Sequence, residues 1–402
     1  MTEASCSASS LRRHLPTLDG WRAVAILLVI LDHGADPLLR ALLALGGHAA
    51  AFSSLAHESL KDPVGRGGVH LFFALSGYLI TRRLLEEEAV RGGVSLPAFY
   101  IRRLFRIQPA ALAYLAVVGI LGLTGVLALT AGGWRGALLG YANLSMASQT
   151  WYTAHFWSLA VEEHFYLLWP IAFVLLGPRR RLAGSLALAG LLALWLWIVV
   201  RYHVTASPYL WVRSDIEGNW VIWGCVAALA EASRAGARLL ELVTPRGTGA
   251  TVLLLALASV LWAGLDAKIV CGLTVLTAAA TPLLLLSTVR RPQALLGRLL
   301  ESRPLRALGR ISYSLYLWQQ LFFVWDSERA AALGGLQAPP WRLPLALGCA
   351  LASYTLLERP MIALGARLLA HQRARFPGEA PQSLWRTLWL LLRIPAGPRR
   401  RR

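Results

Sequence analysis

The sequence predicts an all-α integral membrane protein, a bundle of about ten transmembrane helices with both termini in the cytoplasm. Three observations support this prediction. The 402 residues have a mean hydropathy of +0.53 and only 15% of them are charged, which is typical of membrane proteins. Apolar runs of membrane-spanning length recur along the chain. Arginines gather in alternate connections between these runs.

The apolar runs divide the chain into three parts, which are a cytoplasmic segment at 1–17, a transmembrane domain at 18–366 and a cytoplasmic tail at 367–402. We expect spans at approximately 19–36, 67–86, 108–130, 157–177, 182–201, 217–233, 249–265, 269–288, 309–326 and 343–364. The run at 134–147 is too broken to span and is expected to form an outer loop or a re-entrant piece.

The two ends of the chain have their own signals. No small-residue cleavage site precedes the first span, so we expect a retained signal anchor. In the tail, SLWRTLWLLLRIPAG is too short to cross a bilayer and is followed by four arginines. This pattern predicts an interfacial amphipathic helix that prefers anionic membrane lipid.

Basic residues predict the orientation of the spans. Arginines are frequent near residues 12–13, 82–106, 179–181, 234–246 and 290–310, and sparse in the intervening connections. Cytoplasmic loops carry the excess of basic residues in membrane proteins. This bias and the even number of spans therefore place both termini in the cytoplasm.

Topology also explains the net charge of +19. The basic residues lie between apolar runs and form no stripe or nucleic-acid motif, so we exclude nucleic acid as a partner. The four cysteines have neither metal-ligand nor redox spacing, which indicates no disulfide framework and no metal site.

Arg22 and His33 are the most informative residues of the first span, DGWRAVAILLVILDHG. Their spacing is close to three helical turns, which puts both side chains on one helix face, roughly 16 Å apart. Ionisable groups inside a span are costly and mark functional sites by default. The alternative is that Arg22 snorkels to the inner surface while His33 lies in the outer headgroups.

Orientation separates the other polar residues into an inner and an outer group. In FYIRRLFRIQP, Arg103 and Arg106 are one turn apart at the inner side, a spacing that suits a phosphate-bearing ligand, although such pairs also merely set topology. In FWSLAVEEHFYLLWP, we expect Glu162 and Glu163 in the outer half, where one carboxylate could orient His33 as a general base.

The motifs together resemble the membrane acyltransferase 3 family, bacterial enzymes that modify surface glycans and related sugars. The matching pieces, in order from residue 18 to residue 360, are LDGWRAVAILLVILDHG, GVHLFFALSGYLI, FYIRRLFRIQP, HFWSLAVEEHFYLLWP, LGRISYSLYLW and YTLLERP. The resemblance implies an enzyme of about ten helices in the plasma (inner) membrane, and a cytoplasmic acyl-CoA donor, usually acetyl-CoA.

Carried over by position, the resemblance implies that Arg22 and His33 are the essential first-helix pair, that Arg103 and Arg106 are the RxxR motif, and that Glu162 and Glu163 belong to the VEE segment. Two positions depart from the family. His70 stands where relatives often have Asp, and Gln319 stands where many have His, so neither is assigned proton transfer and both can bear on acceptor choice.

We therefore predict a membrane O-acyltransferase that moves an acyl group, acetyl by preference, from acyl-CoA to a hydroxyl of a carbohydrate, glycolipid or sugar-bearing metabolite. His33 is the expected base, with Arg22 lining the path and Glu162 or Glu163 shaping the pocket. Arg103 and Arg106, with Arg102 or Arg82, are expected to hold the CoA phosphates. The predicted enzyme is compatible with an oligomer, and its mechanism needs no metal.

Two alternatives stay open. A transporter or flippase of an envelope glycan or lipid precursor would use the intramembrane charges to line a path without chemistry. A non-catalytic partner in an envelope-assembly complex would use them for assembly alone.

Overall fold

The computed structural model describes residues 15–34, 49–202, 209–243, 245–261, 267–324 and 332–375. All regular elements in these residues are helical, which confirms the predicted all-α class. The longer helices are α2 (Pro16–Gly34), α4 (Ala49–Arg91), α5 (Leu96–Leu123), α8 (Phe156–Arg201), α9 (Ser214–Ala232), α11 (Pro245–Leu261), α12 (Ala267–Arg290), α14 (Arg303–Phe322), α16 (Arg342–Ser353) and α17 (Arg359–Arg375). The expected interfacial helix of the tail lies outside the described residues.

Three segments among the described residues are long and apolar enough to cross a membrane. They are Leu96–Leu123, Trp151–Arg201 and Cys271–Arg290. In other helices the expected spans contain ionisable groups, as α2 does with Asp19, Arg22 and Asp32. The count of about ten spans and the cytoplasmic position of both termini stay predictions.

Helix α8 contains a reversal at Gly177 and Pro178 that separates the two spans expected at 157–177 and 182–201. Gly177 has φ 63°, a left-handed conformation that favours glycine. Beyond it, Arg181 Nε donates to the carbonyl of Phe173 at 2.7 Å. A straight helix would place residues eight apart about 12 Å from each other, so the chain turns back here.

Short elements fill the stretch before α8. The run expected not to span forms α6 (Ala131–Leu138), η1 (Ala142–Leu144) and η2 (Met146–Ser148), and α7 (Trp151–Ala154) follows. The remaining short helices are η3 (Leu210–Val212), α10 (Arg234–Glu241), α13 (Leu295–Leu300), η5 (Gly334–Gln337) and the π-helix η6 (Tyr354–Glu358).

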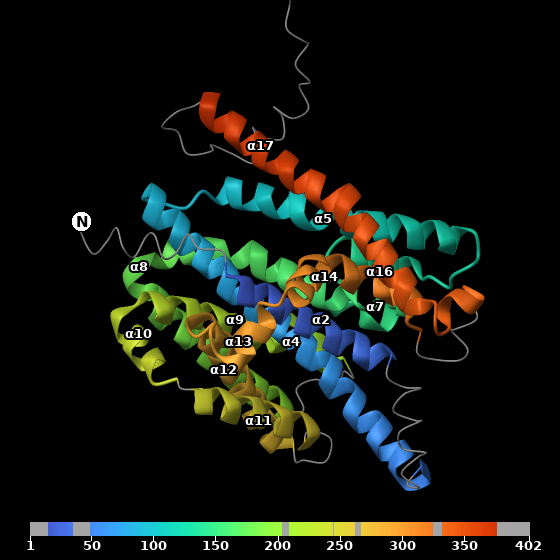
Figure 1. Cartoon of the computed structure of the whole chain (residues 1–402), viewed down its shortest axis with the longest axis horizontal. Coiled ribbons are helices and arrows are strands. Elements are labelled where there is room, and N and C mark those ends of the chain that lie inside the picture. Colours follow the sequence, from blue (N-terminus) through green and yellow to red (C-terminus); the bar gives the residue numbers. More distant parts are fainter. Residues whose placement is uncertain are drawn as a thin grey trace, which may run out of the picture.

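Helices α2 and α14 lie at the centre of the bundle (Figure 1). α2 packs against α4 and α14, α4 packs against α9, and α5 packs against α17. Gly309 of α14 faces the carbonyl of Asp19 in α2, where a Cβ would overlap that oxygen. This contact brings the first span against α14 and forms one wall of the site.

Candidate active site

A cavity of about 350 Å³ lies between α2, α4, α5, α8, α14 and the η6–α17 segment. Along α4 its lining runs from Val69 to Arg83, which corresponds to roughly 20 Å of helix. The Val69 end is mainly apolar. Towards the other end the charged lining residues are Asp19, Arg22, Arg83, Arg103, Arg106, Glu162, Glu163, Arg310 and Glu358.

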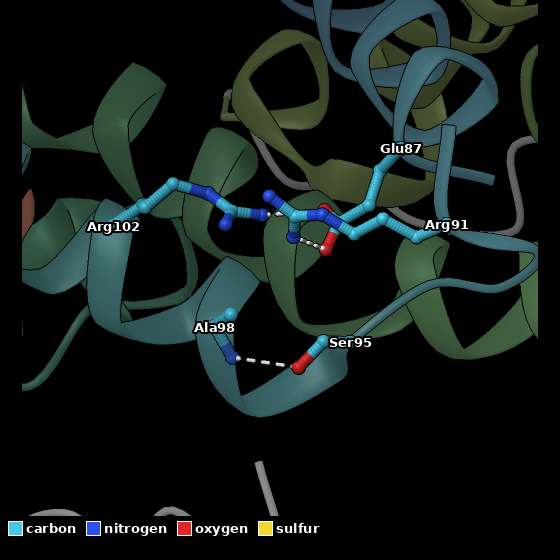
Figure 2. A network of polar contacts seen from close by, with 5 residues as sticks. All are labelled: Glu87, Arg91, Ser95, Ala98 and Arg102. Atoms are coloured by element: carbon cyan, nitrogen blue, oxygen red, sulfur yellow. Dashed lines mark hydrogen bonds and ion pairs between the residues drawn. The ribbon is translucent and has the colours of Figure 1, made fainter. Parts of the chain in front are cut away.

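A helix cap and an ion pair at the start of α5 fix the directions of its arginines. Ser95 caps the helix by accepting a hydrogen bond from the Ala98 backbone N–H at 3.3 Å. Nearby, the carboxylate of Glu87 in α4 accepts from Arg91 and from Arg102, each at 2.7 Å (Figure 2). Arg102 is thus tied to the end of α4, while Arg103 and Arg106 line the cavity.

The cavity concentrates positive charge that no nearby carboxylate neutralises fully. The guanidinium of Arg103 lies 4.7 Å from the ring centroid of Tyr166, and Arg22 is 3.6 Å from Asp19. Among the described residues, Arg83, Arg103 and Arg106 have no carboxylate within ion-pair distance. Because these guanidinium charges repel one another, a bound anion would stabilise the cluster.

Both predicted carboxylates line the cavity, and they have different partners. Glu162 accepts from Ser76 Oγ and from Tyr166 OH, each at 2.6 Å. Glu163 accepts from Gln108 Nε2 at 2.7 Å. In the described part of the chain, neither makes a hydrogen bond to His33, so the structure groups Glu162 and Glu163 with the arginines.

Arg82 lies outside the cavity lining, as Arg102 does. Its Nε donates to Glu86 at 3.0 Å and its Nη1 donates to Tyr78 OH at 3.3 Å. Its neighbour Arg83 lines the cavity in its place. Adjacent helical residues point about 100° apart, which is why one arginine of each consecutive pair turns to a carboxylate and the other to the cavity.

His33 lies beyond the apolar end of the cavity and is held by α14. Its Nδ1 is 2.8 Å from Gln319 Oε1, and its ring contacts Trp151 edge-on at 5.3 Å. The Gln319 amide nitrogen donates to Gln320 Oε1 at 3.0 Å, which fixes the amide orientation. An amide oxygen only accepts, so in this arrangement His33 carries its proton on Nδ1 and has Nε2 free as a base.

Two further histidines, His70 and His164, have partners inside the bundle. His70 Nε2 is 3.0 Å from Glu217 Oε2, and its ring stacks on Trp220 at 3.8 Å. His164 Nδ1 is 2.7 Å from Ser214 Oγ. At position 70, where relatives often have Asp, this chain has a His that lies against the carboxylate of Glu217 from α9. The Glu217 side chain is buried, with only 3% of it exposed.

Sequence reasoning did not single out Arg83, Ser158, Tyr166 and Tyr316, which line the cavity. Each lies within or next to one of the motifs described above, but the local sequence does not show which way a single hydroxyl or arginine side chain points in the bundle. In the described residues, no group of His, Cys, Asp and Glu is arranged to hold a metal ion.

Comparisons with known proteins all point to acyl transfer. A family model described as an acyltransferase domain matches residues 15–359. An O-acetyltransferase OatA of Staphylococcus aureus is 27% identical over 412 residues, covering 96% of this chain and 62% of that protein. The peptidoglycan O-acetyltransferase OatA of Listeria monocytogenes is 28% identical over 337 residues, covering 76% and 49%.

A putative peptidoglycan O-acetyltransferase, YrhL of Bacillus subtilis, is 28% identical over 386 residues, covering 88% of this chain and 56% of that protein. The chain thus spans between about half and two thirds of the length of these relatives. No solved structure matches the chain significantly.

Proposed function

The chain belongs to the acyltransferase family whose domain model covers residues 15–359, and on this premise we propose that it is a membrane O-acyltransferase. In this proposal it transfers an acetyl group from cytoplasmic acyl-CoA to a hydroxyl of a carbohydrate acceptor. The relatives' names, which include peptidoglycan O-acetyltransferase, favour acetyl as the group and a glycan as the acceptor. A multi-pass protein of the bacterial inner membrane fits the apolar helices.

The observation that carries the proposal is the cluster of Arg22, Arg83, Arg103 and Arg106 in one elongated cavity. Guanidinium groups bind phosphate oxygens with paired hydrogen bonds, and CoA carries phosphates at one end and its thioester at the other. The phosphates would occupy the arginine end, and the pantetheine arm would follow the cavity along α4 toward its apolar end. Arg82 and Arg102, which form ion pairs with Glu86 and Glu87, would add positive charge next to the cluster.

His33 is the proposed base. Gln319 holds Nδ1 and leaves Nε2 to accept the proton of the attacking hydroxyl, which is the tautomer that a general base requires. Arg22 is eleven positions earlier on the same helix and lines the donor end. Helix α2 thus connects the donor cluster with the proposed site of proton transfer, and Glu162 and Glu163 shape the cavity between them.

The first test uses the purified full chain in proteoliposomes, with acetyl-CoA as donor and solubilised peptidoglycan as acceptor. We expect acetyl transfer, detected by mass spectrometry, and we expect Arg103→Ala to raise the KM for acetyl-CoA on the order of tenfold. Arg135→Ala is the matched control, because Arg135 donates to the Ala131 carbonyl of its own helix and is not among the described residues that line the cavity. An unchanged KM in Arg103→Ala would contradict the donor site.

The second test separates transfer from transport in cells. Cells carrying the intact gene, a deletion and His33→Ala, matched for protein in the membrane, are compared by mass spectrometry of their envelope glycans. The proposal expects glycans lighter by one acetyl group in both the deletion and the His33→Ala cells. If His33→Ala restored the normal glycans that the deletion had lost, the transporter alternative would replace the proposal.

A further inference from the structure

Two hydroxyl groups meet at the apolar end of the cavity. Ser158 Oγ of α8 and Tyr316 OH of α14 are 2.6 Å apart, and both residues line the cavity. Both hydroxyls also lie against the backbone carbonyl of His155, at 3.2 Å for Ser158 and 3.1 Å for Tyr316. The surrounding walls are apolar and aromatic, with Phe72 packed edge-on against Tyr316.

Ser158 Oγ, Tyr316 OH and the His155 carbonyl oxygen form a triangle of contacts, and it holds fewer protons than contacts. Two hydroxyls supply two protons, whereas the triangle contains three short contacts. His155 is the N-cap of α8, so its carbonyl already accepts a backbone hydrogen bond of the helix and does not depend on either hydroxyl. Ser158 Oγ can therefore donate across the 2.6 Å contact to Tyr316 OH, while Tyr316 turns its own proton toward an oxygen in the cavity.

The position of the pair relates it to the proposed base. Tyr316 lines the cavity, and one turn further along α14 Gln319 holds the ring of His33. The Gln319 amide nitrogen also lies 3.4 Å from the Tyr316 carbonyl, which ties the two positions together. The hydroxyl pair thus lies at the apolar end of the cavity, and its Tyr316 belongs to the helix that also holds the imidazole.

The geometry points to the Tyr316 hydroxyl, supported by Ser158, as the hydrogen-bond donor to the acyl carbonyl oxygen during transfer. This inference rests on the proposed function. The acceptor hydroxyl oxygen adds to the carbonyl carbon, and the carbonyl electron pair moves onto oxygen, where Tyr316 stabilises it. The pair then returns as the C–S bond breaks and the CoA thiolate leaves. The hydroxyl proton passes to His33, and Tyr316 keeps its own proton.

The inference predicts a specific pattern in kinetics. Tyr316→Phe removes the donor and retains the ring, so kcat should fall by about 10²–10³ with little change in the KM for acetyl-CoA. Ser158→Ala should lower kcat by roughly tenfold, because Tyr316 OH then loses the hydroxyl that can donate to it at 2.6 Å. Tyr202→Phe is the control, since Tyr202 is 63% exposed at the end of α8.

The experiment measures release of the CoA thiol from acetyl-CoA, with solubilised peptidoglycan as acceptor, using the unaltered chain and the three variants in proteoliposomes. Rates are expressed per correctly folded protein, determined by thermal unfolding of each preparation. A kcat in Tyr316→Phe equal to that of Tyr202→Phe would overturn this inference and leave the proposed function standing. An unaltered chain that releases no thiol would overturn both.

Discussion

Glu162 is a cavity carboxylate that interacts electrostatically with both Arg103 and Arg22. It lines the cavity with Arg103 and Arg22 and is held by two neutral hydroxyls, those of Ser76 and Tyr166. Its negative charge offsets part of the positive charge in the cavity, and it competes electrostatically with any anionic ligand. Glu163 is held by Gln108 and faces the Gly140 backbone as well as the cavity.

Because Glu162 lies near the arginines, we predict that the Glu162→Gln variant binds CoA more tightly than the unaltered chain. Removal of one negative charge near the arginines should favour an anion by on the order of 1 kcal/mol, a severalfold fall in the dissociation constant. Calorimetric titration of CoA into the purified protein measures the change. Glu163→Gln is the matched substitution and should change the affinity less, and a larger effect at Glu163 would contradict the assignment.

A second residue-scale prediction concerns Gly309, whose position against the Asp19 carbonyl leaves no space for a Cβ. Gly309→Ala must move α14 away from α2, and such overpacking costs about 1–3 kcal/mol. Thermal unfolding should show a lower Tm. Gly348→Ala is the control, because a Cβ at Gly348 meets nothing within 4 Å. Equal Tm values for the two variants would mean that α2 and α14 tolerate separation.

At the scale of elements, the sequence predicts helix locations well and side-chain directions less well. Hydrophobic length locates α12, expected as a span at 269–288, because a bilayer requires long apolar runs. Helix α5 runs from Leu96 to Leu123 and is offset from the span expected at 108–130. Spacing alone does not distinguish Arg102 from Arg103, since the difference depends on Glu87, which reaches α5 from the end of α4 (Figure 2). The contact between His33 and Gln319 joins residues 286 positions apart, which no local pattern reveals.

The turn at Gly177, where the chain reverses within α8, can be tested by substitution. Gly177 adopts φ 63°, which costs a residue with a Cβ roughly 1–2 kcal/mol, so Gly177→Ala should lower the stability. Gly190 lies in the same element with open space around its Cβ position, so Gly190→Ala should raise stability by about 0.5–1 kcal/mol. Denaturant unfolding of both variants gives the comparison, and a stabilised Gly177→Ala would contradict the left-handed turn.

At the scale of the whole molecule, the proposed chemistry requires that the arginine end of the cavity faces the cytoplasm, where acyl-CoA is made available. The cavity is polar at that end and lined mainly by apolar side chains at the other. The excess of arginines in alternate connections favours this direction, because basic loops are retained on the cytoplasmic side. The same bias places Gly93 inside and Ala131 outside, on opposite ends of α5.

This orientation is testable with single cysteines. Gly93 lies in the turn before α5, and Ala131 is the first residue of α6, which follows α5; both are exposed, so substitution should not disturb packing. In intact spheroplasts, a membrane-impermeant maleimide should label Ala131→Cys and should label Gly93→Cys only after permeabilisation. The unaltered chain measures background labelling of its own cysteines. The reverse pattern would place the arginine cluster outside, where cytoplasmic acyl-CoA could not reach it, and the proposed donor would have to be abandoned.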